Sequence, residues 1–216
     1  MPTNTGNQIQ EKLVAKLMVE LLTVKKAVEN LDNEIESEVN NIKPSDVVKF
    51  KQGLLQSKQV QELGQELSEV TQQLNTIVPA ITNNMPSAPT FTISPSAQRY
   101  ASPTEKQKKF LLQVGEWLID KGRKLQGKSL GAGEKKIEKS FYKVVNKIGK
   151  GLEALGVLLK QCAEKNEKVP AKQVEATVND LVKSLKTVQT YFIAPKAVKL
   201  LGLTEENIKP RKPTKR

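Results

Sequence analysis

KIEKSFYKVVNKIGKGLEALGVLLKQC, residues 136–162, carries two regular patterns on one stretch of chain. The first is apolar, because hydrophobic residues recur at steps of three and four, the period of one face of an α-helix. On a helical wheel these residues lie within about 40° of Ile137. They are Ile137, Phe141, Val144, Ile148, Leu155, Leu159 and Cys162. We therefore predict a long helix that buries this face in a core.

The second pattern is a stripe of lysines between roughly 200° and 280° on the same wheel. It consists of Lys136, Lys139, Lys143, Lys147 and Lys150. Lysines four residues apart on a helix repel each other by a few tenths of a kcal/mol unless an anion is present. The phosphates of a nucleic acid supply such an anion. The stripe thus predicts an outward cationic strip, although any solvated helix face has the same pattern.

Positive charge is concentrated in the second half of the chain. The whole chain has a formal charge of +12, whereas residues 1–78 carry eight Lys against eleven acids. The other predicted phosphate contacts are Lys121, Arg123, Lys124, Lys128, Lys209, Arg211, Lys212, Lys215 and Arg216. Lys outnumbers Arg, which favours phosphate contacts over base recognition. Few aromatic residues are present to stack on bases, so the prediction is double-stranded nucleic acid bound without strong sequence specificity.

The first 78 residues carry a heptad pattern typical of long, paired helices. Leu17, Val24 and Leu31 fall at position a, and Val14, Leu21, Val28, Ile35 and Ile42 fall at position d. After Pro44 the spacing resumes at Val47, Phe50 and Leu54 and shifts in phase around residues 53–57. It then continues at Val60, Leu63, Leu67, Val70, Leu74 and Ile77, and Pro79 is expected to end the helix. Two such helices predict an antiparallel, coiled-coil-like hairpin over residues 1–78 that mediates self-association into a homo-oligomer.

The rest of the chain divides at prolines. Residues 79–103 contain five prolines among Ser and Thr, which predicts an extended linker arm. Ser102 and Pro103 then form a helix-start signal, and Pro170 and Pro195 precede further helical patterns. We expect a basic helical bundle over 104–203 and a basic tail over 204–216. The predicted fold class is therefore all-α.

The composition excludes several kinds of chemistry. The chain has no histidine and one cysteine, so Ser-His-Asp triads, Cys/His zinc sites and internal disulfides cannot form. Cys162 is interpreted as a small buried hydrophobe. We predict no enzyme activity, no cofactor, no metal and no small-molecule substrate. No segment resembles a membrane span or a signal sequence, so the expected location is cytoplasmic or within a virion.

Two further features have competing interpretations. Residues 122–129, GRKLQGKS, match the G-x-x-x-x-G-K-S phosphate-binding loop, but that loop needs a preceding strand and a following helix. The spacing here predicts a helix before it and glycines after it, so we favour a plain loop between helices. Gly149, Gly151 and Gly156 lie within the long predicted helix, which indicates the close approach of a neighbouring helix or of a nucleic acid backbone. The acids Glu34, Glu36 and Glu38 are expected to form a solvated face.

These patterns together predict a non-enzymatic structural protein. It would coat or package DNA, as a nucleoid or capsid component does, and would assemble with copies of itself through the first 78 residues. The main alternative is a coiled-coil scaffold or adaptor whose basic half binds an acidic protein. Attachment to an anionic membrane surface is disfavoured, because the lysine stripe lacks neighbouring apolar wedge residues. An enzyme, such as one that hydrolyses ATP, is the least favoured of the functions considered.

Overall fold

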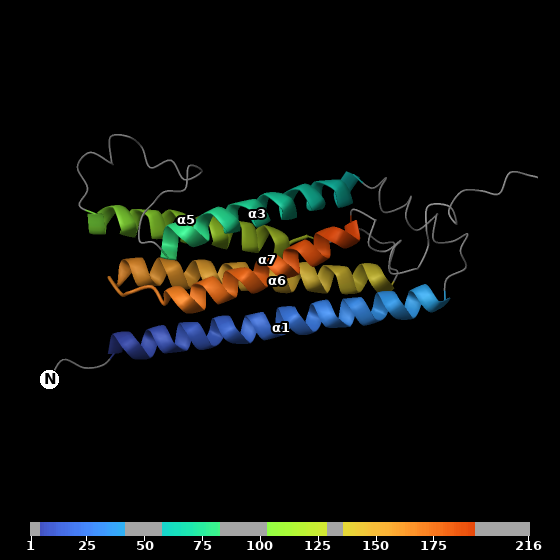
Figure 1. The fold of residues 1–216 in the computed structure, drawn as a ribbon, viewed down its shortest axis with the longest axis horizontal. Helices are drawn as coiled ribbons and strands as arrows, with labels where there is room; N and C mark the ends of the chain where they lie inside the picture. Colours follow the sequence, from blue (N-terminus) through green and yellow to red (C-terminus); the bar gives the residue numbers. More distant parts are fainter. Residues whose placement is uncertain (1–4, 42–57, 83–102, 129–135, 193–216) are drawn as a thin grey trace, which may run out of the picture.

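A computed structural model describes residues 5–41, 58–82, 103–128 and 136–192 of the chain (Figure 1). These residues form five α-helices and no strand, so the all-α prediction is confirmed for them. The helices are α1 (Thr5–Asn41), α3 (Lys58–Thr82), α5 (Pro103–Gln126), α6 (Lys136–Glu164) and α7 (Ala171–Phe192). Most of the predicted arm, the short helix after Pro195 and the tail over 204–216 lie outside the described residues.

The lysine-rich stretch forms α6, which is the central helix of the bundle. α6 packs most extensively against α5, then against α1, and also against α7 (Figure 1). The predicted apolar face is buried from Phe141 to Cys162. Leu152 and Leu158 are fully buried as well, although they lie outside the predicted face. A helix with neighbours on three sides buries a wider arc than one apolar stripe, which explains the difference.

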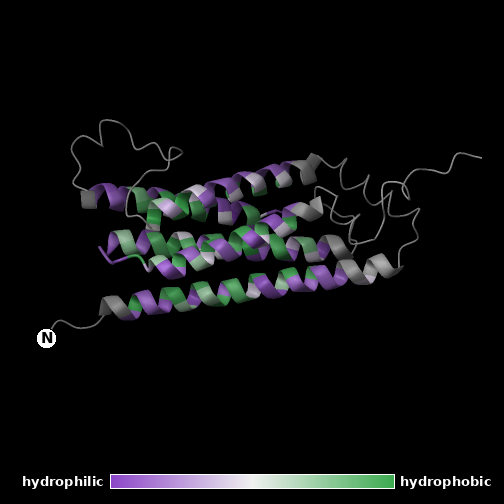
Figure 2. Cartoon of the chain, viewed as in Figure 1, coloured by the Kyte–Doolittle hydropathy of each residue, from purple (hydrophilic) through white to green (hydrophobic). Residues whose placement is uncertain are grey.

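One hydrophobic core joins both halves of the chain. It contains buried side chains from all five described helices, for example Leu17, Leu67, Leu118, Leu155 and Leu181. Figure 2 shows hydrophobic and hydrophilic positions alternating along the described helices, and the hydrophobic core takes its members from this pattern. Full burial of one leucine contributes about 1.5–3 kcal/mol, so the acidic first half and the basic second half stabilise each other directly.

The predicted hairpin between the first two helices is not confirmed. The heptad residues Leu17, Leu21 and Val24 are buried, as expected, but α1 buries them against α6 and α7. α3 makes its main contacts with α7. The spacing of apolar residues fixes which face of a helix is buried but not which helix covers it, and here the second half of the chain provides the larger apolar surface.

The end of α3 also differs from the prediction. Pro79 lies inside the helix, which continues to Thr82. A proline removes one backbone hydrogen-bond donor and costs most in a helix interior. At Pro79 the cost falls in the last turn, and the residues that follow, Ala80 and Ile81, are both buried in the core. Burial of these side chains favours one more helical turn.

Glycines allow α5 and α6 to approach until their backbones touch. An added Cβ at Gly149 would lie 2.5 Å from the carbonyl oxygen of Gly122, and one at Gly156 would lie 2.6 Å from that of Gly115. The two glycines on each helix are seven residues apart, so they form two matching contacts along one antiparallel face. Of the two approaches predicted for Gly149 and Gly156, the neighbouring helix is therefore the one observed.

The chain turns between α6 and α7 at Asn166, which has a φ of 59°. The backbone N–H of Asn166 donates to the Ala163 carbonyl, and that of Glu167 donates to the Cys162 carbonyl at 2.9 Å. This is the Schellman pattern that closes a helix C-terminus, with Asn in the left-handed position usually taken by Gly. Pro170 then precedes α7, as the sequence predicted.

Candidate nucleic-acid interface

The predicted basic residues of α5 and of the turn that follows it are all held in ion pairs. Lys121 pairs with Glu69 at 3.5 Å and Lys128 with Glu66 at 2.9 Å, so both reach acids on α3. Arg123 pairs with Glu153 at 2.9 Å and Lys124 with Asp120 at 2.9 Å. Ion pairs within the chain therefore neutralise part of the charge difference between its two halves. These four cations are not arranged as an unpaired outward surface.

The protonation of two groups reflects these pairings. A side-chain hydrogen bond to Asp120 raises the pKa of Lys124 above its ordinary value. The pKa of Glu153 is lowered, first by the hydrogen bond that the Gln126 amide donates to it at 2.8 Å, and then by the bond from Arg123. Both shifts favour the charged forms of Lys124 and Glu153.

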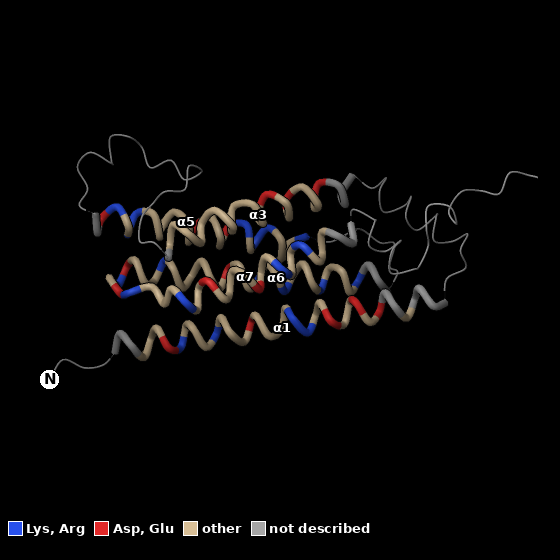
Figure 3. The backbone as a smooth tube through the Cα atoms, viewed as in Figure 1, with Lys and Arg blue, Asp and Glu red and all other residues tan. Residues whose placement is uncertain are grey.

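The lysines of α6 have a different environment. Lys143 and Lys150 are exposed and Lys147 is half-buried, and none of the three forms an ion pair with an acid in the described residues. Lys139 is exposed and has an interaction of its own. The side chain of Lys136 lies outside the described set. Figure 3 shows basic and acidic positions interspersed along the helices. Lysines without an ion pair also occur elsewhere in the described residues, for example Lys16, Lys26 and Lys172, but on α6 three of them lie on one helix face.

A groove runs beside these lysines, between α1 and α6. It has a volume of about 290 Å³ and is lined by Thr23, Lys26, Ala27, Asn30, Glu34, Ser140, Lys143 and Lys147. The Ser140 hydroxyl donates a hydrogen bond to the Glu34 carboxylate at one end. Three ammonium groups thus share the groove with one carboxylate, and Thr, Asn and Ser add neutral hydrogen-bonding groups. Such a lining suits an anionic oxygen ligand.

The five predicted basic residues of the tail, Lys209, Arg211, Lys212, Lys215 and Arg216, lie outside the described residues. Of the acidic run near the end of α1, Glu34 is half-buried and bonded to Ser140, whereas the side chains of Glu36 and Glu38 are not described. The solvated acidic face predicted there is thus only partly visible, and its first residue contributes to the groove instead.

The first five residues of the phosphate-loop-like segment, 122–126, belong to the end of a helix. α5 continues to Gln126, and Gly122 lies inside it, packed against Gly149 of α6. Gly127 donates its backbone N–H to the Arg123 carbonyl at 3.0 Å, which is a helix-terminating bond, and Lys128 is paired with Glu66. Ser129 lies outside the described residues. The helix predicted before the loop is confirmed, and the first glycine of the pattern is used for helix packing.

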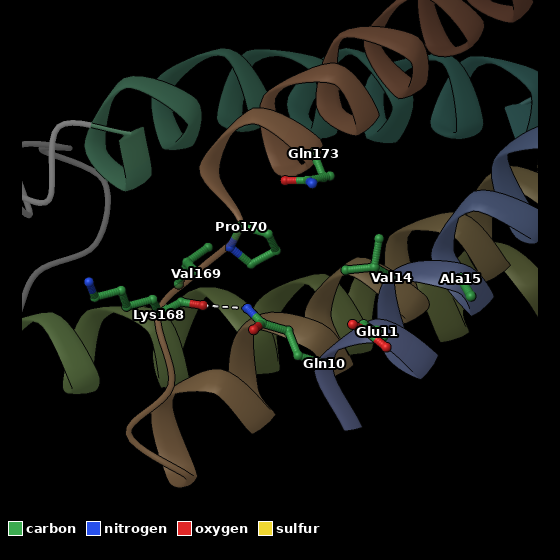
Figure 4. A pocket seen from close by; sticks show the side chains of 8 residues that line it. All are labelled: Gln10, Glu11, Val14, Ala15, Lys168, Val169, Pro170 and Gln173. Carbon is green, nitrogen blue, oxygen red and sulfur yellow. Dashed lines mark hydrogen bonds between the residues drawn. The ribbon is translucent and has the colours of Figure 1, made fainter. Parts of the chain in front are cut away.

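A second groove, of about 560 Å³, opens between the start of α1 and the start of α7 (Figure 4). α1 contributes Gln10, Glu11, Val14 and Ala15, and the other side is formed by Lys168, Val169, Pro170 and Gln173. The Gln10 side-chain amide donates to the Lys168 carbonyl across its floor. Four of the eight lining residues are apolar, and the groove carries one acid, Glu11, and one base, Lys168, so it has the character of a docking surface for a side chain rather than for a phosphate.

Cys162 is buried, as predicted, and burial raises the pKa of its thiol to about 11. Among the described residues no group of acids and sulfur ligands could hold a metal ion. None of the described helices is long and apolar enough to cross a membrane. The chain matches no protein-family model, and comparisons with curated proteins and with solved structures gave no match.

Proposed function

We propose that this chain is a non-enzymatic structural protein that binds the phosphate backbone of double-stranded nucleic acid through α6. The observation that carries the proposal is the set Lys143, Lys147 and Lys150, which lack an acidic partner in the described residues. The three span seven residues, or about 10 Å at 1.5 Å per residue. Phosphates on one strand rise by about 3.4 Å each along a duplex, so a length of about 10 Å covers four of them, and three ammonium groups along it can each contact a different phosphate.

The contrast with α5 supports the choice of α6. A paired cation must lose its acid before it can release counterions from a nucleic acid, so it contributes less to binding than an unpaired one. Lys121, Lys124 and Lys128 are paired in this way. The α1–α6 groove adds the Asn30 side-chain amide beside Lys147, a group that can donate hydrogen bonds to phosphate oxygens as polar side chains do in other backbone-binding surfaces.

The test is fluorescence anisotropy with a random-sequence duplex at salt concentrations from about 50 to 300 mM. The variant K143Q/K147Q/K150Q removes three phosphate contacts, so it should bind more weakly and lower the log–log salt slope by about 2.7, at about 0.9 per contact. The matched control is R123Q/K124Q/K128Q, which removes the same charge from ion-paired positions and should change the slope much less.

Three outcomes would contradict the proposal. The first is no binding of the wild-type protein at low salt, and the second is equal binding by the α6 variant and the wild type. The third is equal loss in both variants, which would mean that net charge alone determines affinity. Binding to poly-glutamate as tight as binding to the duplex would favour the alternative, an acidic protein partner.

A further inference from the structure

The outer face of α1 carries the large hydrophobic side chains that are most exposed in the described residues. Met18 is 52% exposed, Val19 59% and Leu22 58%. Residues three and four apart are neighbours on a helix surface, so these three form one patch, to which the exposed Ala15 adds a small residue. The patch lies opposite the buried face of Leu17, Leu21 and Val24, so the core does not account for it.

Charged residues lie at the two ends of this patch and have opposite signs. Glu11 precedes Ala15 by one turn, and Lys26 follows Leu22 by one turn. Neither forms an ion pair with a described residue. In order along α1 the outer face therefore has an acid, a small residue, large apolar residues and a base.

This order is self-complementary when a second α1 lies antiparallel to the first. With Met18 opposite Val19 of the other copy, Ala15 comes to lie opposite Leu22, and Glu11 opposite Lys26. Each of these pairs occurs twice, related by a two-fold axis between Met18 and Val19. A two-fold interface needs this property, since the same surface must serve both partners.

The groove at the start of α1 provides the recess that such a contact needs. Glu11, Val14 and Ala15 form its α1 wall, and Pro170 and Val169 form part of the other side (Figure 4). In the antiparallel register, the Leu22 side chain of one copy lies over Ala15 and the mouth of this groove on the other. The large Leu22 side chain of one copy thus packs on the small Ala15 of the other, beside the groove. Glu11 of that other copy lies one turn away, where it can pair with Lys26.

We propose that α1 is a homodimer surface, in which two copies of this chain pack antiparallel through Met18, Val19 and Leu22 with reciprocal Glu11–Lys26 ion pairs. The proposal does not rest on nucleic-acid binding. It differs from the self-association expected from the heptad residues, because those residues are buried inside the bundle. A single helix face on each side is a small interface, so the dimer should be in reversible equilibrium with the monomer.

The experiment is sedimentation velocity of the full chain at concentrations from about 1 µM to 1 mM. The wild type should shift from monomer to dimer within this range. Leu22→Glu places two carboxylates in the apolar contact and should keep the protein monomeric throughout. The matched control is Ala176→Glu, which adds the same charge at an exposed position of α7 and should leave the dimer unchanged. Both sites are exposed, so the circular dichroism should stay helical.

A charge swap tests the register itself. Glu11→Lys and Lys26→Glu, made singly, each turn two attractive pairs into repulsive ones and should raise the dimer Kd by about tenfold. The double variant E11K/K26E restores both pairs with reversed signs, so its Kd should return to near the wild-type value. A wild type that stays monomeric at about 1 mM, a Leu22→Glu protein that still dimerises, or a double swap weaker than both singles would overturn the proposal.

Discussion

Gly149→Ala tests the close contact between α5 and α6. The new Cβ would lie 2.5 Å from the Gly122 carbonyl oxygen and 3.1 Å from the Gln126 backbone nitrogen. Carbon–oxygen contacts of this kind are ordinarily about 3.3–3.6 Å, so the two helices must separate by nearly 1 Å. Both atoms belong to the backbone, which cannot rotate away. The structure therefore predicts a cost typical of overpacking, about 1–3 kcal/mol.

Ala also favours the helix over Gly by about 1 kcal/mol, and this gain must be separated from the clash. Gly64→Ala in α3 provides the matched control, because an added Cβ there meets no atom within 4 Å. Gly64→Ala should be stabilising, whereas Gly149→Ala should be less stable than Gly64→Ala by about 1–3 kcal/mol.

Thermal unfolding followed by circular dichroism measures the difference. For a chain of this size 1 kcal/mol shifts Tm by about 2–4 °C, so the two variants should differ by roughly 2–12 °C. Urea unfolding with an unchanged m value would show that the folded state, rather than the unfolded one, carries the effect. If Gly149→Ala is as stabilising as Gly64→Ala, then α5 and α6 do not approach as closely as described.

Two further predictions concern single residues near the end of α6. Because burial raises the pKa of Cys162 to about 11 from the ordinary value of 9.0, the unfolded state loses this proton at lower pH than the folded state. The stability contributed by the neutral thiol is therefore present below pH 9 and is lost as the pH rises towards 11. Urea titrations should show the unfolding free energy of the wild type falling across this pH range. In Cys162→Ala the unfolding free energy should fall less over the same range. Asn166 has a φ of 59°, and Ala tolerates this left-handed region less well than Asn, so Asn166→Ala should lower the unfolding free energy by about 1 kcal/mol. Asn166→Gly should leave the stability unchanged or raise it. Equal Tm values for the two variants would contradict the turn geometry.

Several features of the fold were predictable because they depend on local sequence. The steps of three and four in α6 identify its buried face from Phe141 to Cys162, and the same spacing identifies the buried residues of α1 and α3. The start of α5 at Pro103 and the break before α7 at Pro170 follow from the backbone restrictions of proline. Pro79 shows the limit of this reasoning, because burial of Ala80 and Ile81 extends α3 beyond it.

The candidate interface was predictable only in part. The sequence located every cation on its helix, but it could not distinguish Lys143 and Lys150, which have no described acidic partner, from Lys121 and Lys128, which are paired with Glu69 and Glu66 of α3. Each of these pairs joins residues more than fifty positions apart. A helical wheel contains no information about a helix that comes from another part of the chain.

The exposed patch on α1 escaped the sequence reasoning for a similar reason. The heptad pattern drew attention to Leu17 and Leu21, and Met18 and Leu22 are the residues that directly follow them. Their exposure becomes evident only when the inner face has been assigned to α6 and α7.

Residue spacing by itself determined that this chain is helical, which side of each helix is apolar, and which catalytic and metal-binding chemistries its composition rules out. Only the tertiary structure decided which helices meet, which charges are neutralised and which apolar side chains remain outside. The periodicity of a helix is a local property that every few residues repeat. The partner of a given face depends instead on the free energy of packing the whole chain at once, in which close contacts such as Gly122 with Gly149 select one arrangement of the same helices.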